Sequence, residues 1–123
     1  GIGGLDTWDG YTEERDEIHN FLYKNNISGV TVLSADRHRS DVRRIPREKG
    51  YPFYEFMSSM LTNYHTHPVV ETPELIFGYN EDNTFGLLHF NTMTDDPTIT
   101  FEIVTIDNKS VWSMDIELSQ LKD

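Results

Sequence analysis

The chain has 123 residues, of which 37% are hydrophobic and 12% aromatic, and it contains no cysteine. These values predict one globular domain and exclude disulfides, cysteine zinc sites and thiol nucleophiles, while leaving the compartment open. The formal net charge of −11 argues against nucleic acid as a general partner. No apolar stretch approaches the roughly 18 to 20 residues that a membrane span needs.

The chain begins at Gly1 without an initiator methionine or a signal-like leader. We therefore expect residues 1–123 to be either a single domain or a fragment of a longer chain. Within it we expect a motif-bearing α/β part over residues 1–65 and antiparallel strands over residues 74–119.

The first predicted helix covers residues 12–24. Thr12 is its expected N-cap, and the acidic residues that follow suit the positive end of a helix. Ile18, Phe21 and Leu22 recur at helical spacing and should form its apolar face.

A short buried strand is expected over residues 29–34, because Val30, Val32 and Leu33 form an apolar, partly β-branched run. Its continuous apolar character predicts cover on both faces. A polar, basic loop should follow over residues 36–49, then a second strand over 53–57 and an irregular stretch over 64–73.

After Glu74 the apolar residues alternate with polar ones. This period of two predicts strands at residues 75–79, 84–91, 98–106 and 110–118, joined by turns, in one antiparallel meander. The fold class is therefore α+β: an α/β unit followed by an antiparallel β meander.

The end of the first strand carries the leading candidate site. Asp36 and His38 stand two residues apart where the polarity changes abruptly. Carboxylate oxygen suits hard cations and imidazole nitrogen suits zinc or iron, so the pair could bind a metal or lie beside a metal-bound phosphate. A capped strand end with a surface histidine is the structural alternative.

Basic residues cluster around this pair, although the protein as a whole is acidic. Such a region suits a compact anionic ligand, and a solvated loop with compensating charge is the alternative. Its members are Arg37, Arg39, Arg43, Arg44, Arg47 and Lys49.

Two further groups could take part in chemistry. The loop from Asp6 to Tyr11 places Trp8 and Asp9 beside a glycine and a second aromatic ring. This loop could form the edge of a cleft, or its aromatic residues could pack over the core. His65 and His67 could bind a metal, but their irregular segment favours surface or packing roles.

Four segments occur in a specific order and spacing: Asp6-Thr-Trp-Asp-Gly-Tyr11, Val32-Leu-Ser-Ala-Asp36-Arg-His38-Arg-Ser40, Tyr54-Glu-Phe-Met-Ser-Ser59 and Leu61-Thr-Asn63. This combination resembles the alkaline phosphatase D family of metallophosphatases. The resemblance covers about residues 5–65 and only the C-terminal part of such enzymes. It implies the C-terminal half of a four-layer α/β/β/α sandwich with a bimetal centre.

By this resemblance the parent protein is a metal-dependent phosphatase or phosphodiesterase, and enzymes of this kind are commonly exported. The resemblance makes Asp36 a metal ligand and His38 a metal or phosphate contact with a catalytic role. Arg37 is a catalytic candidate, because a guanidinium could hold a phosphate oxygen, and Arg39 is a substrate-binding candidate for the same reason.

The same resemblance makes Trp8, Asp9 and Tyr11 candidate substrate-binding residues in a wall of the active-site region. Ala35 stands where the family usually has glycine, which would strain the chain if the backbone there needed a positive φ.

The family's earlier metal-binding motifs do not occur in the 123 residues. We therefore expect calcium, iron, manganese or zinc to be held jointly with missing ligands from the upstream part of the same protein. The chain alone should be incomplete as an active site, and it should act on a phosphoester substrate only as part of its parent.

Two alternatives remain open. One is a noncatalytic C-terminal module that binds a partner or sugar through Tyr79, Phe90 and Trp112. The other is a fragment that folds fully only with its missing half, whose exposed surface would make it a homo-oligomer.

Overall fold

The structure, a computed structural model, describes residues 6–123. It contains one α-helix, α1 (Thr12–Lys24), and two short 3-10 helices, η1 (Trp8–Gly10) and η2 (Leu118–Leu121). The strands of the described residues are β1 (Val32–Ser34), β2 (Ser40–Ile45), β3 (Phe53–Met57), β4 (Leu75–Tyr79), β5 (Thr84–Asn91), β6 (Thr98–Thr105) and β7 (Ser110–Glu117). This confirms the α+β class.

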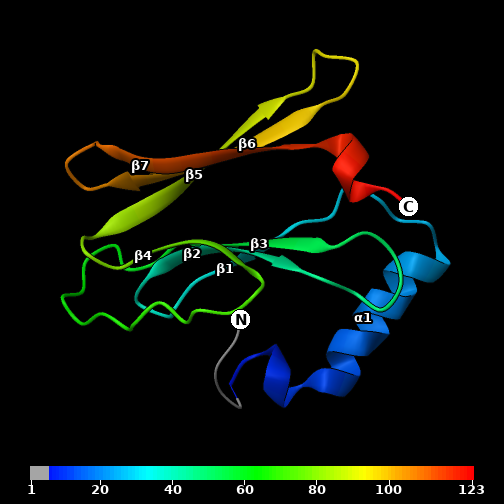
Figure 1. The fold of residues 1–123 in the computed structure, drawn as a ribbon, viewed down its shortest axis with the longest axis horizontal. Coiled ribbons are helices and arrows are strands. Elements are labelled where there is room, and N and C mark those ends of the chain that lie inside the picture. The colour runs from blue at the N-terminus through cyan, green and yellow to red at the C-terminus, as the bar shows by residue number, and fades with distance from the viewer. Residues whose placement is uncertain (1–5) are drawn as a thin grey trace.

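The strands form two small sheets that face each other (Figure 1). The first sheet is mixed and has the order β1-β3-β2-β4, with β1 parallel to β3 and the other pairs antiparallel. The second sheet is the antiparallel meander β5-β6-β7. Helix α1 lies beside the first sheet, on the side away from the second (Figure 1).

Aromatic side chains join the two sheets. Phe56 of β3 stacks on Phe101 of β6 with ring centroids 4.6 Å apart, and Phe77 of β4 stacks on Trp112 of β7 at 4.8 Å. Val42 and Ile103 are fully buried between them. The core therefore lies between the sheets, and the opposite face of the first sheet is left for other contacts.

Several sequence predictions about local structure are confirmed. The helix begins and ends at Thr12 and Lys24, the strand over 53–57 has the expected bounds, and residues 64–73 are irregular. The last two strands pair as a hairpin from Thr98 to Glu117. No helix in the described part of the chain is long and apolar enough to cross a membrane.

The prediction for the start of the helix is wrong in one respect. Tyr11 is the N-cap, without a side-chain hydrogen bond, and Thr12 is the first helical residue. The expected apolar face is also only partly covered: Leu22 packs against the core, while Ile18 and Phe21 are 46% and 59% exposed.

The prediction of a buried strand over residues 29–34 is only partly confirmed. Strand β1 is shorter than predicted and lies at the edge of its sheet, where Leu33 is 62% exposed. The apolar run correctly indicated a strand, but among residues 6–123 no neighbour covers Leu33, so the predicted cover on both faces is wrong.

The basic stretch is not a loop throughout, because residues 40–45 form β2 in the interior of the first sheet. Pairing with β3 and β4 satisfies its backbone, and a hydrophobic pattern could not reveal the strand because it buries the polar residues Ser40, Asp41 and Arg43. The four-stranded meander is wrong as well: β4 pairs with β2, so the meander contains only β5, β6 and β7.

Candidate functional site

The turn between β1 and β2 carries Asp36 and His38. Both adopt a left-handed backbone conformation, with φ of 70° for Asp36 and 49° for His38. Asp36 is exposed and His38 is half-buried. Ala35 is not among the residues with a positive φ, so the methyl group that replaces the family's glycine causes no strain of that kind.

Side chains from the irregular segment meet His38 at this turn. The ring centroids of His65 and His67 each lie 5.4 Å from that of His38 and 4.9 Å from each other. The pKa of His67 is lowered, first by partial desolvation and then by His65 and His38. The His-x-His pattern was the only sequence signal for this cluster, and its irregular segment favoured a surface role.

Arg37 connects the turn to the N-terminal loop. Its Nη1 lies 3.7 Å from Oδ1 of Asp6, and its side chain is 22% exposed. The structure therefore brings Asp6 next to the turn that contains Asp36 and His38.

Arg39 has a different environment, because its side chain is only 2% exposed. Its Nε donates to Oδ2 of Asp41 at 2.8 Å, and Arg43 donates from Nε to Oδ1 of the same carboxylate at 3.2 Å. Arg43 also donates to the Thr72 hydroxyl and to the Val70 carbonyl. This Arg39–Asp41–Arg43 triad anchors the irregular segment to the first sheet.

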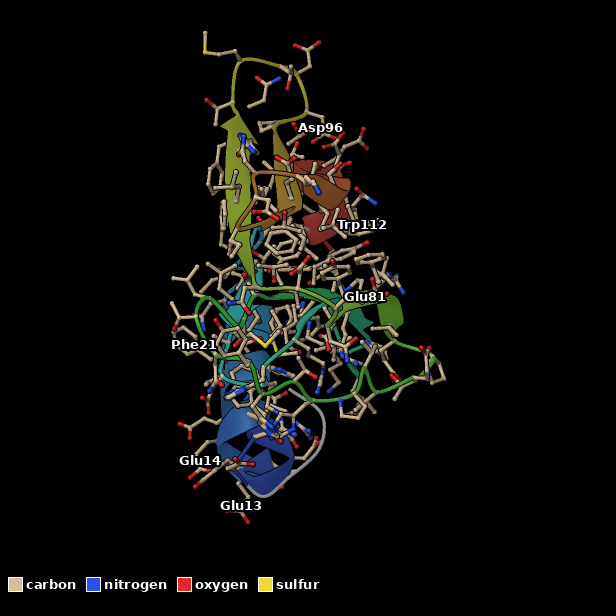
Figure 2. The ribbon with its side chains drawn as sticks, turned by 90° about the vertical axis from the view of Figure 1, so that its left-hand side faces the viewer. Glu13, Glu14, Phe21, Glu81, Asp96 and Trp112 are labelled. Carbon is tan, nitrogen blue, oxygen red and sulfur yellow. The ribbon has the colours of Figure 1, made fainter. Side chains whose placement is uncertain are left out.

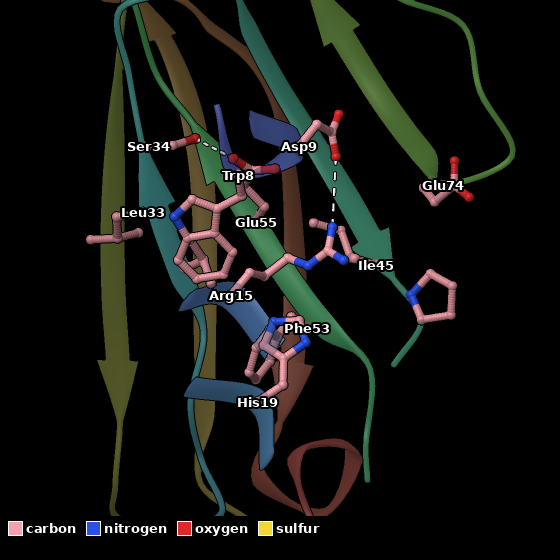
Figure 3. Close-up of a pocket in the computed structure, with 12 residues that line it drawn as sticks. Trp8, Asp9, Arg15, His19, Leu33, Ser34, Ile45, Phe53, Glu55 and Glu74 are labelled. Atoms are coloured by element: carbon pink, nitrogen blue, oxygen red, sulfur yellow. Dashed lines mark hydrogen bonds and ion pairs between the residues drawn. The ribbon is translucent and has the colours of Figure 1, made fainter. Parts of the chain in front are cut away.

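A cavity of about 510 Å³ lies between α1 and the outer face of the first sheet. Its lining residues include Trp8 and Asp9 of η1, Ser34 of β1 and Glu55 of β3 (Figure 3). Ser34 donates to Glu55 Oε1 at 2.7 Å, and Asp9 pairs with Arg15 of α1 at 3.7 Å.

The cavity takes in only some of the predicted substrate-binding residues. Trp8 and Asp9 line it, whereas Tyr11 is 55% exposed and does not. Asp36 and His38 do not line it either, although Ser34, at the end of the same strand, does. The two candidate regions are thus neighbours along β1 rather than one enclosed site.

The three aromatic residues of the alternative binding surface differ in exposure, and Tyr79 is half-buried. Trp112 is half-buried against Phe77, between the sheets (Figure 2), while Phe90 is 66% exposed. The structure therefore gives the noncatalytic module no specific support.

Among residues 6–123 no group of three or more histidine, aspartate or glutamate side chains is arranged to hold a metal ion. Asp36 and His38 have the donor chemistry of metal ligands and would supply two of the ligands of such a site.

Known proteins are similar to this chain in sequence. A model of the PhoD-like phosphatase family matches residues 3–96, so the chain belongs to the PhoD-like phosphatase family. It is also similar to alkaline phosphatase D of Bacillus subtilis (strain 168), with 41% identity over 39 residues. That match covers 32% of this chain and 7% of the relative, and no solved structure matches.

Proposed function

We propose that this chain is the C-terminal portion of a metal-dependent phosphoester hydrolase of the alkaline phosphatase or phosphodiesterase type. Proteins of the PhoD-like family are generally metal-dependent. The observation that carries the proposal is the β1–β2 turn, where Asp36 and His38 stand together in left-handed conformations within the matched region.

Two side chains of this turn would contribute to a metal site. The exposed carboxylate of Asp36 and the Nε2 atom of His38 are the donors that calcium, iron, manganese or zinc would use here. Such ions, when bound, polarise phosphoryl oxygen and lower the pKa of bound water. The remaining ligands would come from the upstream part of the same protein, which would also complete a four-layer sandwich.

The arginines beside the turn differ in their suitability for a phosphate. Arg37 pairs with Asp6 at 3.7 Å and its side chain is 22% exposed, so a phosphate oxygen could reach its forked guanidinium donors from solvent. Arg39 would have to leave Asp41 first, because the buried ion pair holds its Nε. Of the two, Arg37 is the better candidate for substrate contact.

The N-terminal loop would form a wall near this site. Trp8 and Asp9 line the cavity that runs along β1, and Asp6 pairs with Arg37. A substrate larger than its phosphate group could extend along this wall toward Trp8, while Tyr11 would contact it only beyond the cavity.

The test uses the full-length protein with p-nitrophenyl phosphate and bis-p-nitrophenyl phosphate, which separate monoesterase from diesterase activity. Asp36→Asn and His38→Ala should lower turnover by about 10²- to 10³-fold, the usual cost of removing one electrostatic contact to a transition state. His89→Ala, on the distant strand β5, is the matched control and should keep full turnover.

A second measurement addresses the metal directly. Calcium, iron, manganese and zinc salts should raise the melting temperature of the full-length protein, and Asp36→Asn should abolish the rise. Absence of metal at Asp36 and His38 in the full-length protein, together with unchanged turnover in both variants, would refute the proposed function.

A further inference from the structure

The turn that contains His38 is held by two backbone groups of the segment 63–67. The Nδ1 atom of His38 lies 2.7 Å from the carbonyl oxygen of His65. In the other direction, the backbone N–H of His67 donates to the carbonyl oxygen of His38 at 3.3 Å. His38 is therefore contacted by the same segment at its ring and at its backbone.

The first of these hydrogen bonds determines the tautomer of His38. A carbonyl oxygen can only accept, so the proton of a neutral His38 ring must be on Nδ1. The Nε2 atom then carries a lone pair and no hydrogen. In this state Nε2 can bind a cation but cannot donate a hydrogen bond to a phosphate oxygen.

The segment is itself fixed at two points. The side-chain oxygen of Asn63 accepts from the backbone N–H of His65 at 2.9 Å, and the Asn80 side chain donates to the carbonyl oxygen of His67 at 3.1 Å. The imidazoles of His65 and His67 also pack edge-to-face on the His38 ring. These contacts limit rotation of the ring as well as movement of the turn.

We propose that residues 63–67 are a positioning segment for His38. Its backbone fixes the Nδ1–H tautomer and the left-handed turn, so that His38 presents Nε2 as a metal ligand rather than as a donor to phosphate. This assignment of a metal ligand rests on the proposed function, whereas the tautomer itself does not. Hydrogen bonds of this kind to the second ring nitrogen commonly orient metal-binding histidines.

The first experiment observes the tautomer in the 123-residue chain, without any metal. Two-bond ¹⁵N–¹H spectra of the histidine rings at about pH 8, above the ordinary histidine pKa of about 6.5, distinguish the two tautomers. Wild-type His38 should be mostly in the Nδ1–H form. A His38 ring that is mostly in the Nε2–H form would overturn the proposal.

Paired variants separate the backbone contacts from the side chains. His67→Pro removes the N–H that binds His38, while His67→Ala keeps it. Asn63→Ala removes the acceptor for His65, while Asn63→Asp keeps one. His67→Pro and Asn63→Ala should shift His38 toward the Nε2–H form. The control variants His67→Ala and Asn63→Asp should keep the wild-type tautomer of His38.

Tyr64→Ala is a further control, because this side chain is 95% exposed within the same segment. Circular dichroism shows whether each variant is folded. If His67→Pro does not fold, the comparison of Asn63→Ala with Asn63→Asp tests the proposal. If the tautomer of His38 is unchanged in folded His67→Pro and Asn63→Ala, the proposal fails.

A second experiment concerns metal affinity in the full-length protein, measured by titration with manganese or zinc salts. Asn63→Ala should weaken binding by about 10- to 100-fold, the usual effect of losing an outer contact to a metal ligand, and Asn63→Asp should restore it. If the tautomer responds as expected but metal binding does not, the positioning of the ring stands and its role as a metal ligand fails. If neither responds, both fail.

Discussion

At the scale of single residues, the left-handed conformation of Asp36 is a measurable property of the candidate site. A left-handed backbone costs most L-residues roughly 1–2 kcal/mol, and glycine adopts it freely. Asp36→Gly should therefore be more stable than Asp36→Ala by about 1 kcal/mol in urea unfolding. At Glu48, which has no positive φ, the glycine variant should be the less stable one. An alanine variant at position 36 as stable as the glycine variant would contradict the assigned conformation.

His19 provides a prediction about pH. Burial lowers its pKa, Arg47 and Arg15 lower it further, and Asp16 opposes them. The unfolded chain therefore binds a proton at higher pH than the folded chain, so stability should fall as pH drops below about 6.5 toward the lower folded pKa.

The comparison that checks this is urea unfolding at about pH 7.5 and about pH 5.5. His19→Gln should lose less stability between these two conditions than wild type, because glutamine does not titrate. Asn20→Gln, at the neighbouring position of α1, should keep the wild-type difference. If His19→Gln loses as much stability between the two pH values as wild type, His19 does not contribute to the pH dependence of stability.

At the scale of elements, β2 owes its place in the sheet to buried charge pairing. Arg39, Asp41 and Arg43 are each at most 2% exposed, and Asp41 accepts hydrogen bonds from both arginines. Removing one partner of such a group leaves a buried charge without compensation.

Asp41→Ala should accordingly lower the free energy of unfolding by about 3–5 kcal/mol. Arg44→Ala, at an exposed position of the same strand, should change it by no more than about 0.5 kcal/mol. The measurement is urea denaturation followed by circular dichroism. Equal effects of the two substitutions would show that the Arg39–Asp41–Arg43 triad does not stabilise β2.

At the scale of the whole molecule, the chain leaves apolar surface uncovered. Ile18 and Phe21 of α1 are 46% and 59% exposed, and Leu33 on the edge strand β1 is 62% exposed. Exposed apolar groups and open strand edges favour association with another surface. Under the proposed function, an upstream part of the same protein would meet this surface.

We expect the isolated chain to self-associate well above micromolar concentration, as measured by light scattering. Phe21→Asp should reduce this association by placing a charge on the uncovered face of α1. Tyr64→Ser is the control, since Tyr64 is a single exposed ring on the irregular segment. A wild-type chain that stays monomeric at these concentrations would contradict the expectation.

The sequence by itself determined the features that depend on neighbouring residues. Helical spacing located α1, alternation located β5, β6 and β7, and the motifs around Trp8, Asp36 and Tyr54 correctly indicated the family. These signals are local, so they can be recognised without knowing which segments meet.

Only the tertiary structure decided what depends on distant partners. It placed β4 beside β2, buried Arg39 and Arg43 against Asp41, and brought His65 and His67 to His38. The physical reason is that strand pairing and the burial of charge are stabilised by groups far apart in the chain. The pattern Asp36-x-His38 predicted a candidate site, but the hydrogen bond from His38 to the His65 carbonyl identifies which ring nitrogen is free to act there.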